Sequence, residues 1–597
     1  MLGAVAGGLL ALYLVYPIAG GYDTPIGPDG PLYVWWTRFT EAHGLGAVPF
    51  RAGTPAATLV LGRILGTEPI TTIALLGPAL GVACGLAGAA LLEALLGTDR
   101  LRTAAAAAFV GAWAGSLAGS YLANVALAGM FLVAAAALGV GRRSWRAVGG
   151  AAGLLLAAGL AHAAFIPILA AILAGVVALY VPEALAELRG GARLRDVFAV
   201  RVTVGATAGF LGAGAGSVAL LDGAALRVDS SRDAFLRRAG LRGMLRDTFR
   251  LRTLSDLVRF GVPLASAGVL VRTGRTATGQ EDGRYLRRLL GWWAVLSLMA
   301  FVIVGATGRG QANRLLAFGF FAPLAAAVAL RGAVARRRAV AWIAAAVLVS
   351  GGMYGWYRQG SHMKVEERLG VEAAARSVAA LPADTPLVFL VDTIDETAAA
   401  YHMTRYANVV RAGLPVDRIP HVRVALGRPR NFLQGRPTVW RELEHDVTSR
   451  RSLQDVRPVL DRAVVFVIEP FNVPWFEEAV GVGRTITEGV VAIGGRAGEL
   501  AAVPAAFRPA PGPTGVPLLV VPLLLALLVL GGGWARWILP GTSPLAVLLA
   551  APSVGLAATI VGGVAADMLG LALSSWAGVA VVAALGAAGY VLALRRR

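Results

Sequence analysis

The chain has 597 residues, of which 57% are hydrophobic and only 15% are charged. Soluble globular proteins carry about 25% charged residues, so this composition excludes an ordinary soluble protein. The net charge of +20 is almost entirely arginine, and Lys364 is the only lysine. No basic cluster with interleaved aromatic residues accompanies that charge, so no nucleic-acid partner is predicted.

Apolar runs recur along most of the chain, and each is long enough to cross about 30 Å of hydrocarbon. They lack the alternation typical of a transmembrane barrel. We therefore expect a polytopic α-helical membrane protein with about fourteen spans. The predicted spans are 1–18, 71–95, 103–119, 122–140, 148–162, 164–182, 199–221, 259–272, 289–306, 314–331, 339–357, 514–532, 542–563 and 570–592. The 259–272 segment is short enough to be re-entrant.

Residues 358–512 form the only sizeable polar region. Short β-rich runs at 387–391 and 464–468 alternate with segments predicted to be helical, which indicates a small α/β domain with a partly parallel sheet. The predicted helices are 365–380, 393–408 and 437–446. The chain thus divides into a membrane core at 1–357 with a first loop at 19–70, the α/β domain at 358–512, and C-terminal transmembrane helices at 513–597.

Arginines fall on alternate loops, which predicts that these loops share the cytoplasmic side of the plasma membrane. Both termini are then cytoplasmic, and the 19–70 loop and the 358–512 domain are extracytoplasmic. The arginine-rich 222–258 loop lies on the outer side against this rule. It either binds lipid phosphates or lies as a surface helix on anionic headgroups.

The first loop carries two aspartates, Asp23 and Asp29. Asp29 precedes Gly30-Pro31, a pattern typical of a cap before a helix that begins with proline, here 31–43. Asp23 lies just beyond the first span in a Gly-Tyr-Asp-Thr-Pro turn. It either caps that turn or serves as a carboxylate base at the membrane surface.

Further residues on the same predicted side of the membrane are candidate site residues. Arg309 and Arg314 lie in one turn, Gly-Arg-Gly-Gln-Ala-Asn-Arg, where they either bind a phosphate or anchor a span at the interface. His162 interrupts a Gly/Ala-rich run, and a polar side chain at that depth is a functional hypothesis unless it is hydrogen-bonded within the bundle. Tyr121 and Asn124, in the preceding outer turn, are weaker candidates.

This arrangement resembles the GT-C glycosyltransferases, the membrane enzymes that use polyprenyl-phosphate sugars; protein mannosyltransferases and mycobacterial arabinofuranosyltransferases are examples. The resemblance covers roughly residues 1–357. It implies sugar transfer to a glycan, lipid or protein hydroxyl on the extracytoplasmic face, with Asp23 as the base. Arg314, Arg309 and His162 would contact the donor phosphate, with Asp29 and Tyr121 as further substrate contacts. The family's loop often shows paired acidic residues, whereas Asp23 and Asp29 are separated.

No cofactor is predicted: a phosphate monoester is already a fair leaving group, so a divalent metal is not obligatory, and the dispersed acidic residues do not make a convincing metal site. Three rival functions stay open: a transporter or flippase for a lipid-linked or anionic substrate, a scaffold that binds a partner, and a glycan polymerase or ligase that uses diphosphate-linked donors, for which the basic 222–258 loop would suit two phosphates. A transporter needs polar residues at mid-membrane. The spans are nearly free of mid-membrane charge apart from Glu93 and Asp567, which lie towards segment ends, and this pattern favours an enzyme that works on one face.

Overall fold

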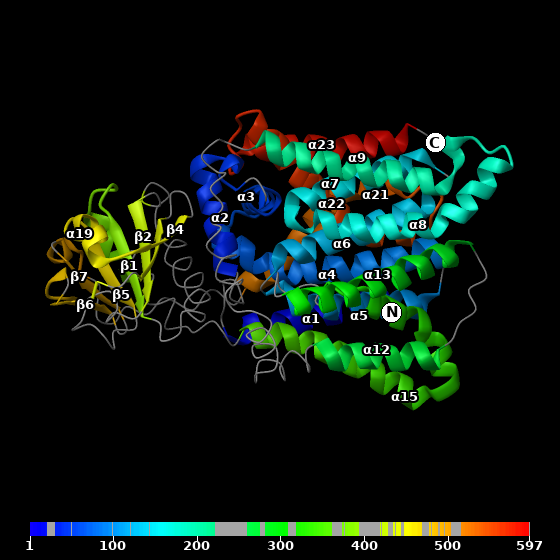
Figure 1. Ribbon diagram of the computed structural model, residues 1–597, viewed down its shortest axis with the longest axis horizontal. Helices are drawn as coiled ribbons and strands as arrows, with labels where there is room; N and C mark the ends of the chain where they lie inside the picture. The colour runs from blue at the N-terminus through cyan, green and yellow to red at the C-terminus, as the bar shows by residue number, and fades with distance from the viewer. Residues whose placement is uncertain are drawn as a thin grey trace.

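In the computed structural model, long helices lie side by side in a bundle, and a small sheet domain lies beyond one end of it (Figure 1). The structure describes residues 1–20, 30–48, 51–97, 99–119, 121–142, 144–220, 260–274, 281–307, 318–360, 373–374, 376–392, 418, 421–427, 434–435, 438–442, 447–468, 477–478, 480–487, 490–494, 496–502 and 515–595. Asp23, Asp29, Arg309, Arg314 and the 222–258 loop lie outside these described residues.

Nine helical segments of the described chain are long and apolar enough to cross a membrane. They contain α1 (Leu2–Gly20), α4 (Pro69–Leu96), α6 (Leu122–Val140), α8 (Ile166–Arg189), α9 (Phe198–Ala219), α15 (Phe321–Gly360), α21 (Val520–Ile538), α22 (Pro544–Met568) and α23 (Trp576–Leu594). The prediction of a polytopic helical membrane protein is confirmed.

The remaining predicted spans also coincide with helices. They are α5 (Arg100–Ala118), α7 (Trp145–Ala161), α12 (Val262–Thr273), α13 (Glu281–Thr307) and the second half of α15, which is broken at Arg337 by a non-helical backbone. The break falls between the predicted spans 314–331 and 339–357. α12 has 12 residues, about 18 Å of helix, so it is too short to cross the hydrocarbon alone.

The centre of the bundle is built on small residues. α4 and α6 are almost completely buried, whereas α1, α9 and α23 are exposed along most of their length and would face lipid. A Cβ on Gly85 would clash with the backbone of α5, and Cβ atoms on Gly531 and Gly555 would clash across the α21–α22 contact. Glycine at these positions lets the helices approach closely, as is common in membrane bundles.

The sheet domain contains seven strands among the described residues, in the order β4-β3-β2-β1-β5-β7-β6. Central β1 pairs in parallel with β2 and β5, and the outer pairs are antiparallel. The strands are β1 (Leu387–Asp392), β2 (Val422–Gly427), β3 (Thr438–Glu442), β4 (Val447–Arg451), β5 (Val464–Ile468), β6 (Arg484–Thr487) and β7 (Val490–Ile493). Helix α19 (Leu453–Leu460) packs its Val456 and Leu460 onto β5, and the predicted partly parallel sheet is confirmed.

The helix predicted over 437–446 is wrong. Residues 438–442 form β3, which pairs with β2 and β4. Thr438, Val439 and Trp440 favour strands, and the two flanking strands supply backbone partners that a helix could not use. Tertiary pairing therefore overrides the helix-forming glutamates and arginine in the same segment.

The two ends of the bundle differ in charge. Both termini lie towards the end remote from the sheet domain, and we call this the terminus end (Figure 1). Helices α4, α6, α8, α21 and α23 end there and α5, α7, α9 and α13 begin there, so the following arginines gather at that end: Arg100, Arg102, Arg142, Arg146, Arg189, Arg193, Arg195, Arg284, Arg288, Arg536 and Arg595. We call the other end, next to the sheet domain, the domain end.

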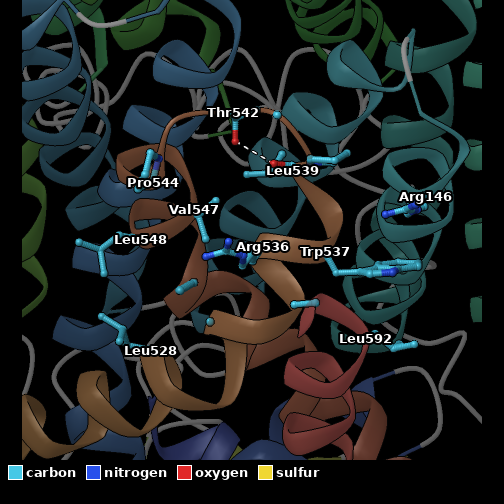
Figure 2. Close-up of a pocket in the computed structure, with 15 residues that line it drawn as sticks. Arg146, Leu528, Arg536, Trp537, Leu539, Thr542, Pro544, Val547, Leu548 and Leu592 are labelled. Carbon is cyan, nitrogen blue, oxygen red and sulfur yellow. Dashed lines mark hydrogen bonds between the residues drawn. The ribbon is translucent and has the colours of Figure 1, made fainter. Parts of the chain in front are cut away.

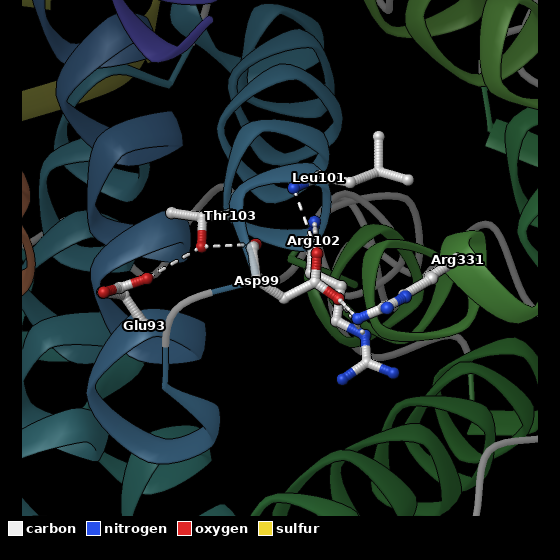
Figure 3. Close-up of polar contacts among 6 residues, drawn as sticks. All are labelled: Glu93, Asp99, Leu101, Arg102, Thr103 and Arg331. Atoms are coloured by element: carbon white, nitrogen blue, oxygen red, sulfur yellow. Dashed lines mark hydrogen bonds and ion pairs between the residues drawn. The ribbon is translucent and has the colours of Figure 1, made fainter.

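Asp99 joins the start of α5 to α15 at the terminus end (Figure 3). Its carboxylate accepts hydrogen bonds from the backbone N–H groups of Leu101 (3.1 Å) and Arg102 (3.3 Å), which caps α5, and it pairs with the guanidinium of Arg331 from α15 (3.1 Å). Partial burial opposes the charged form, but the Arg102 N–H and the Arg331 and Arg102 guanidinium groups outweigh it. The pKa of Asp99 is therefore lowered from its usual 3.8.

We predict that Asp99→Ala lowers the free energy of unfolding by about 1 kcal/mol at neutral pH, because the cap and the ion pairs are lost together. Asp99→Asn keeps an acceptor for the cap and should cost less. Since the folded pKa is lowered, the charge of Asp99 stabilises the fold at neutral pH, and this contribution is lost as pH falls through the folded pKa. Denaturant unfolding in detergent at pH 7 and near pH 3 measures both effects; equal stability of all three proteins at pH 7 would contradict this role.

Candidate functional site

The first-loop helices close over the domain end of the bundle. They are α2 (Gly30–His43), the short η1 (Leu45–Ala47) and α3 (Gly53–Leu65). The buried Tyr33 hydroxyl of α2 accepts a hydrogen bond from the backbone N–H of Ala123 (3.2 Å), one of the unpaired N–H groups at the start of α6. Gly53 of α3 lies directly against the backbone of Ala161, the residue before His162. The first loop therefore packs on the two outer turns that contain Tyr121 and His162.

Asp567, near the end of α22, holds the same loop from the opposite side. Both of its carboxylate oxygens lie 3.2 Å from the backbone nitrogen of Leu45, which donates to them at the start of η1. The preceding Gly44 has φ +77° and faces Asp567, so a larger residue would be strained there. This contact joins residues more than 500 positions apart, and sequence reasoning noted Asp567 only as a charge near a segment end.

His162 sits at the turn between α7 and η3 (Ala163–Phe165) and is almost fully buried. Its backbone N–H donates to the Ala158 carbonyl (3.1 Å), and its carbonyl accepts from Phe165 (3.0 Å). The imidazole packs edge-on against the Phe165 ring, with the ring centroids 4.9 Å apart. The prediction of a tight turn at His162 is confirmed in the described chain.

Tyr121 and Asn124 belong to the neighbouring turn. Tyr121 is the N-cap residue of α6 and is partly buried. Asn124, one turn into the helix, is 1% exposed, and its side-chain amide nitrogen has no hydrogen-bond partner among the described residues. A buried amide donor without a partner costs free energy, so the structure adds weight to Asn124 as a candidate site residue.

The chain that enters α15 reaches the same region. Phe318 follows Arg314 by four residues, is buried, and packs against Phe165 with centroids 5.4 Å apart. Phe165 in turn contacts His162. Phe131 and Trp293 extend this aromatic cluster into α6 and α13. The cluster brings the segment after the Arg309/Arg314 turn to the His162 turn.

Of the predicted site residues, the structure describes His162, Tyr121 and Asn124, and it places all three under the first-loop helices. Asp23, Asp29, Arg309 and Arg314 lie outside the described residues, so their roles stay predictions. Among the described residues no group of three or more His, Cys, Asp or Glu side chains is arranged to hold a metal ion.

At the terminus end, in contrast, the basic side chains of several helices are engaged in contacts within the protein. Arg288 of α13 donates to Glu183 of α8 (2.7 Å) and lies over the Tyr180 ring (4.2 Å). Arg201 donates to the carbonyls of Gly141 (3.0 Å) and Arg142 (2.8 Å), which closes the turn after α6. Such contacts stabilise the helix ends and occupy side chains that could otherwise contact a substrate.

Comparison with known proteins gives one fold likeness. No family model matches the sequence, and no curated protein matches it. The chain is similar to the crystal structure of ArnT from Cupriavidus metallidurans in the apo state. The TM-score is 0.49 at 14% identity, with 81% of this chain and 96% of ArnT covered.

The Asp567 contact makes a prediction about the first loop. Asp567→Ala removes the acceptor of the Leu45 N–H, and a hydrogen bond to a charged group contributes about 1.5–3 kcal/mol, so amide exchange at Leu45 should accelerate at least about tenfold. Asp567→Asn keeps an acceptor and should accelerate exchange less. Hydrogen–deuterium exchange with mass spectrometry on peptides covering η1 measures the effect, with the Ala123 region as internal control. Unchanged exchange at Leu45 in Asp567→Ala would show that Asp567 does not hold the loop.

Proposed function

We propose that this protein is a membrane glycosyltransferase of the GT-C type. It would transfer a sugar from a polyprenyl-phosphate donor to a hydroxyl of a glycan, lipid or protein. The acceptor oxygen bonds to the anomeric carbon, the bond from that carbon to the phosphate oxygen breaks, and polyprenyl phosphate leaves. The acceptor proton passes to a carboxylate.

The observation that carries this proposal is the meeting of three chain segments at the domain end. The first-loop helices cover the turns of Tyr121 and His162, and Phe318 brings the start of α15 against Phe165 in the same place. A transferase needs a base and a phosphate contact close together. The loop that carries Asp23 and the segment that carries Arg314 both adjoin elements packed around these turns.

The proposed roles follow from side-chain chemistry. Asp23 acts as the general base that accepts the acceptor's proton. Arg314, with Arg309, stabilises the charge on the departing phosphate, because a guanidinium stays charged and donates two parallel hydrogen bonds. His162 adds a donor at the same phosphate, and Asp29 and Tyr121 contact the substrates. A phosphate monoester is a fair leaving group, so no divalent metal is required.

The distribution of buried charge supports a one-sided enzyme over a transporter. The buried charged side chains of the described helices are Glu93, near the end of α4, and Arg201, in the first turn of α9, and both lie at the terminus end. The described spans thus offer no charged path through the middle of the bundle. Transport of an anionic substrate would need one.

The same proposal assigns sides to the molecule. The terminus end, with its arginines, is cytoplasmic and the domain end is extracytoplasmic. The donor's lipid would then lie in the outer leaflet, with its phosphate at the level of the first loop. The 358–512 domain stands beyond this end and would bind the acceptor or cover the site.

The proposal predicts that Asp23→Asn lowers sugar transfer by about 10²- to 10⁴-fold, the usual contribution of a general base. Arg314→Gln should also lower the rate, because it removes the phosphate contact. The assay follows release of polyprenyl phosphate in membranes supplied with polyprenyl-phosphate mannose or polyprenyl-phosphate arabinofuranose.

Glu41→Gln is the matched control. It removes another carboxylate from the first loop, at a residue that pairs with Arg38 and has no proposed role in the reaction, so sugar transfer should stay close to the wild-type rate. Transfer by Asp23→Asn at the wild-type rate would remove Asp23 from the role of base. Absence of transfer by the wild-type protein from any polyprenyl-phosphate sugar would contradict the proposed function itself.

A further inference from the structure

A groove of about 450 Å³ lies at the terminus end, among α7, α21, α22 and α23 (Figure 2). It is formed around the turn from α21 to α22, which runs from Leu539 to Thr542. Its volume is within the range of about 300–1,000 Å³ that ligand pockets occupy. The groove lies at the opposite end of the bundle from the candidate site, so it is a separate site.

The charged side chains of the groove are both arginines. Arg146, in the first turn of α7, and Arg536, in the last turn of α21, line it, and none of the lining residues is acidic. No ion pair joins either arginine to a carboxylate among the described residues. At the same end, by contrast, Arg102 and Arg331 share Asp99, and Arg284 and Arg288 share Glu183. Within the part of the chain that the structure describes, the groove therefore carries two arginines and no carboxylate that pairs with them.

The carboxylate of Glu93, close to this turn, is already engaged. Its oxygens accept hydrogen bonds from the hydroxyls of Thr103 (3.0 Å) and Ser543 (2.8 Å), and Ser543 directly follows the groove residue Thr542. Both of these contacts of Glu93 are thus with neutral hydroxyl donors. An external anion is left as the natural partner of Arg146 and Arg536.

Apart from the two arginines and Thr542, the lining residues of the groove are apolar side chains and glycines. Figure 2 shows Arg536 in the middle of the groove, with Leu528 and Leu548 on one side and Trp537 and Arg146 on the other. Leu548 is half exposed, and Leu592 of α23 extends the apolar wall. Helix ends with arginine and tryptophan lie at the level of lipid headgroups, and leucines beside them lie at the level of acyl chains.

We propose that this groove binds an anionic phospholipid. Arg146 and Arg536 bind the headgroup phosphate, and an acyl chain lies along Leu528, Leu548 and Leu592. Basic pockets between transmembrane helices recognise anionic headgroups by this combination of charge and apolar surface. Inorganic phosphate offers the charge without the chain, and phosphatidylcholine offers the chain without the net charge, so both should bind more weakly.

The test uses the full-length protein, purified and delipidated in detergent. Phosphatidylglycerol, phosphatidylcholine or inorganic phosphate is titrated, and lipid adducts are counted by native mass spectrometry with thermal unfolding in parallel. Phosphatidylglycerol should bind at least tenfold tighter than phosphatidylcholine and raise the unfolding temperature. The double variant R146Q/R536Q should lose at least tenfold of this affinity, and R146K/R536K should keep most of it.

The matched control is R193Q/R195Q. It removes the same charge at the same end, from two exposed arginines outside the groove, and should bind phosphatidylglycerol as the wild type does. Three results would overturn the proposal: equal affinity for phosphatidylcholine, equal stabilisation by inorganic phosphate, or unchanged binding in R146Q/R536Q. If R146Q/R536Q does not fold, the folded R146K/R536K variant, which keeps both charges, is used instead. The proposal would be overturned if R146K/R536K bound phosphatidylglycerol no more tightly than R193Q/R195Q binds phosphatidylcholine.

Discussion

In hydrocarbon, every buried polar group must find its partner inside the protein, and this constraint decides where chemistry can occur in this molecule. Within the spans, the hydroxyls of Thr203 and Thr559 donate to carbonyls of their own helices, and the buried Tyr13 hydroxyl of α1 donates to the Gly111 carbonyl of α5. The rest of the buried core of the bundle consists mainly of apolar side chains. The polar side chains that remain for a substrate are therefore found at the helix ends.

The polar groups at the two ends of the bundle find their partners in different ways. At the terminus end, carboxylates such as Asp99 and Glu183 pair with several arginines, whereas the groove around Arg536 is lined by two arginines and by no acidic residue. At the domain end, Tyr33 and Asp567 instead hold the backbone of neighbouring segments and so shape a covered surface over the His162 turn. The ion pairs therefore fix the helix ends at the terminus end, and the first-loop helices are held in place at the domain end.

Much of the fold could be predicted because its signals are local. Run length and hydropathy located the helices, and even the break at Arg337 falls where an arginine cluster separates two predicted spans. The strand at 438–442 could not be predicted, because its pairing with β2 and β4 is not local. The Asp567–Leu45 and Tyr33–Ala123 contacts could not be predicted either, because they join distant parts of the chain. The sequence predicts Asn124 as a weaker candidate by its place in the outer turn, and the structure adds that its amide nitrogen is buried without a partner among the described residues.

The central claim is that one base and one phosphate contact share a cavity at the domain end. An experimental structure with polyprenyl phosphate bound tests it most directly, by measuring the distance from the Asp23 carboxylate to the Arg314 guanidinium. The proposed reaction predicts that both groups face one cavity beside His162 and lie within about 15 Å, a generous span for a sugar and its phosphate. A larger separation, with no cavity in common, would contradict the transferase mechanism.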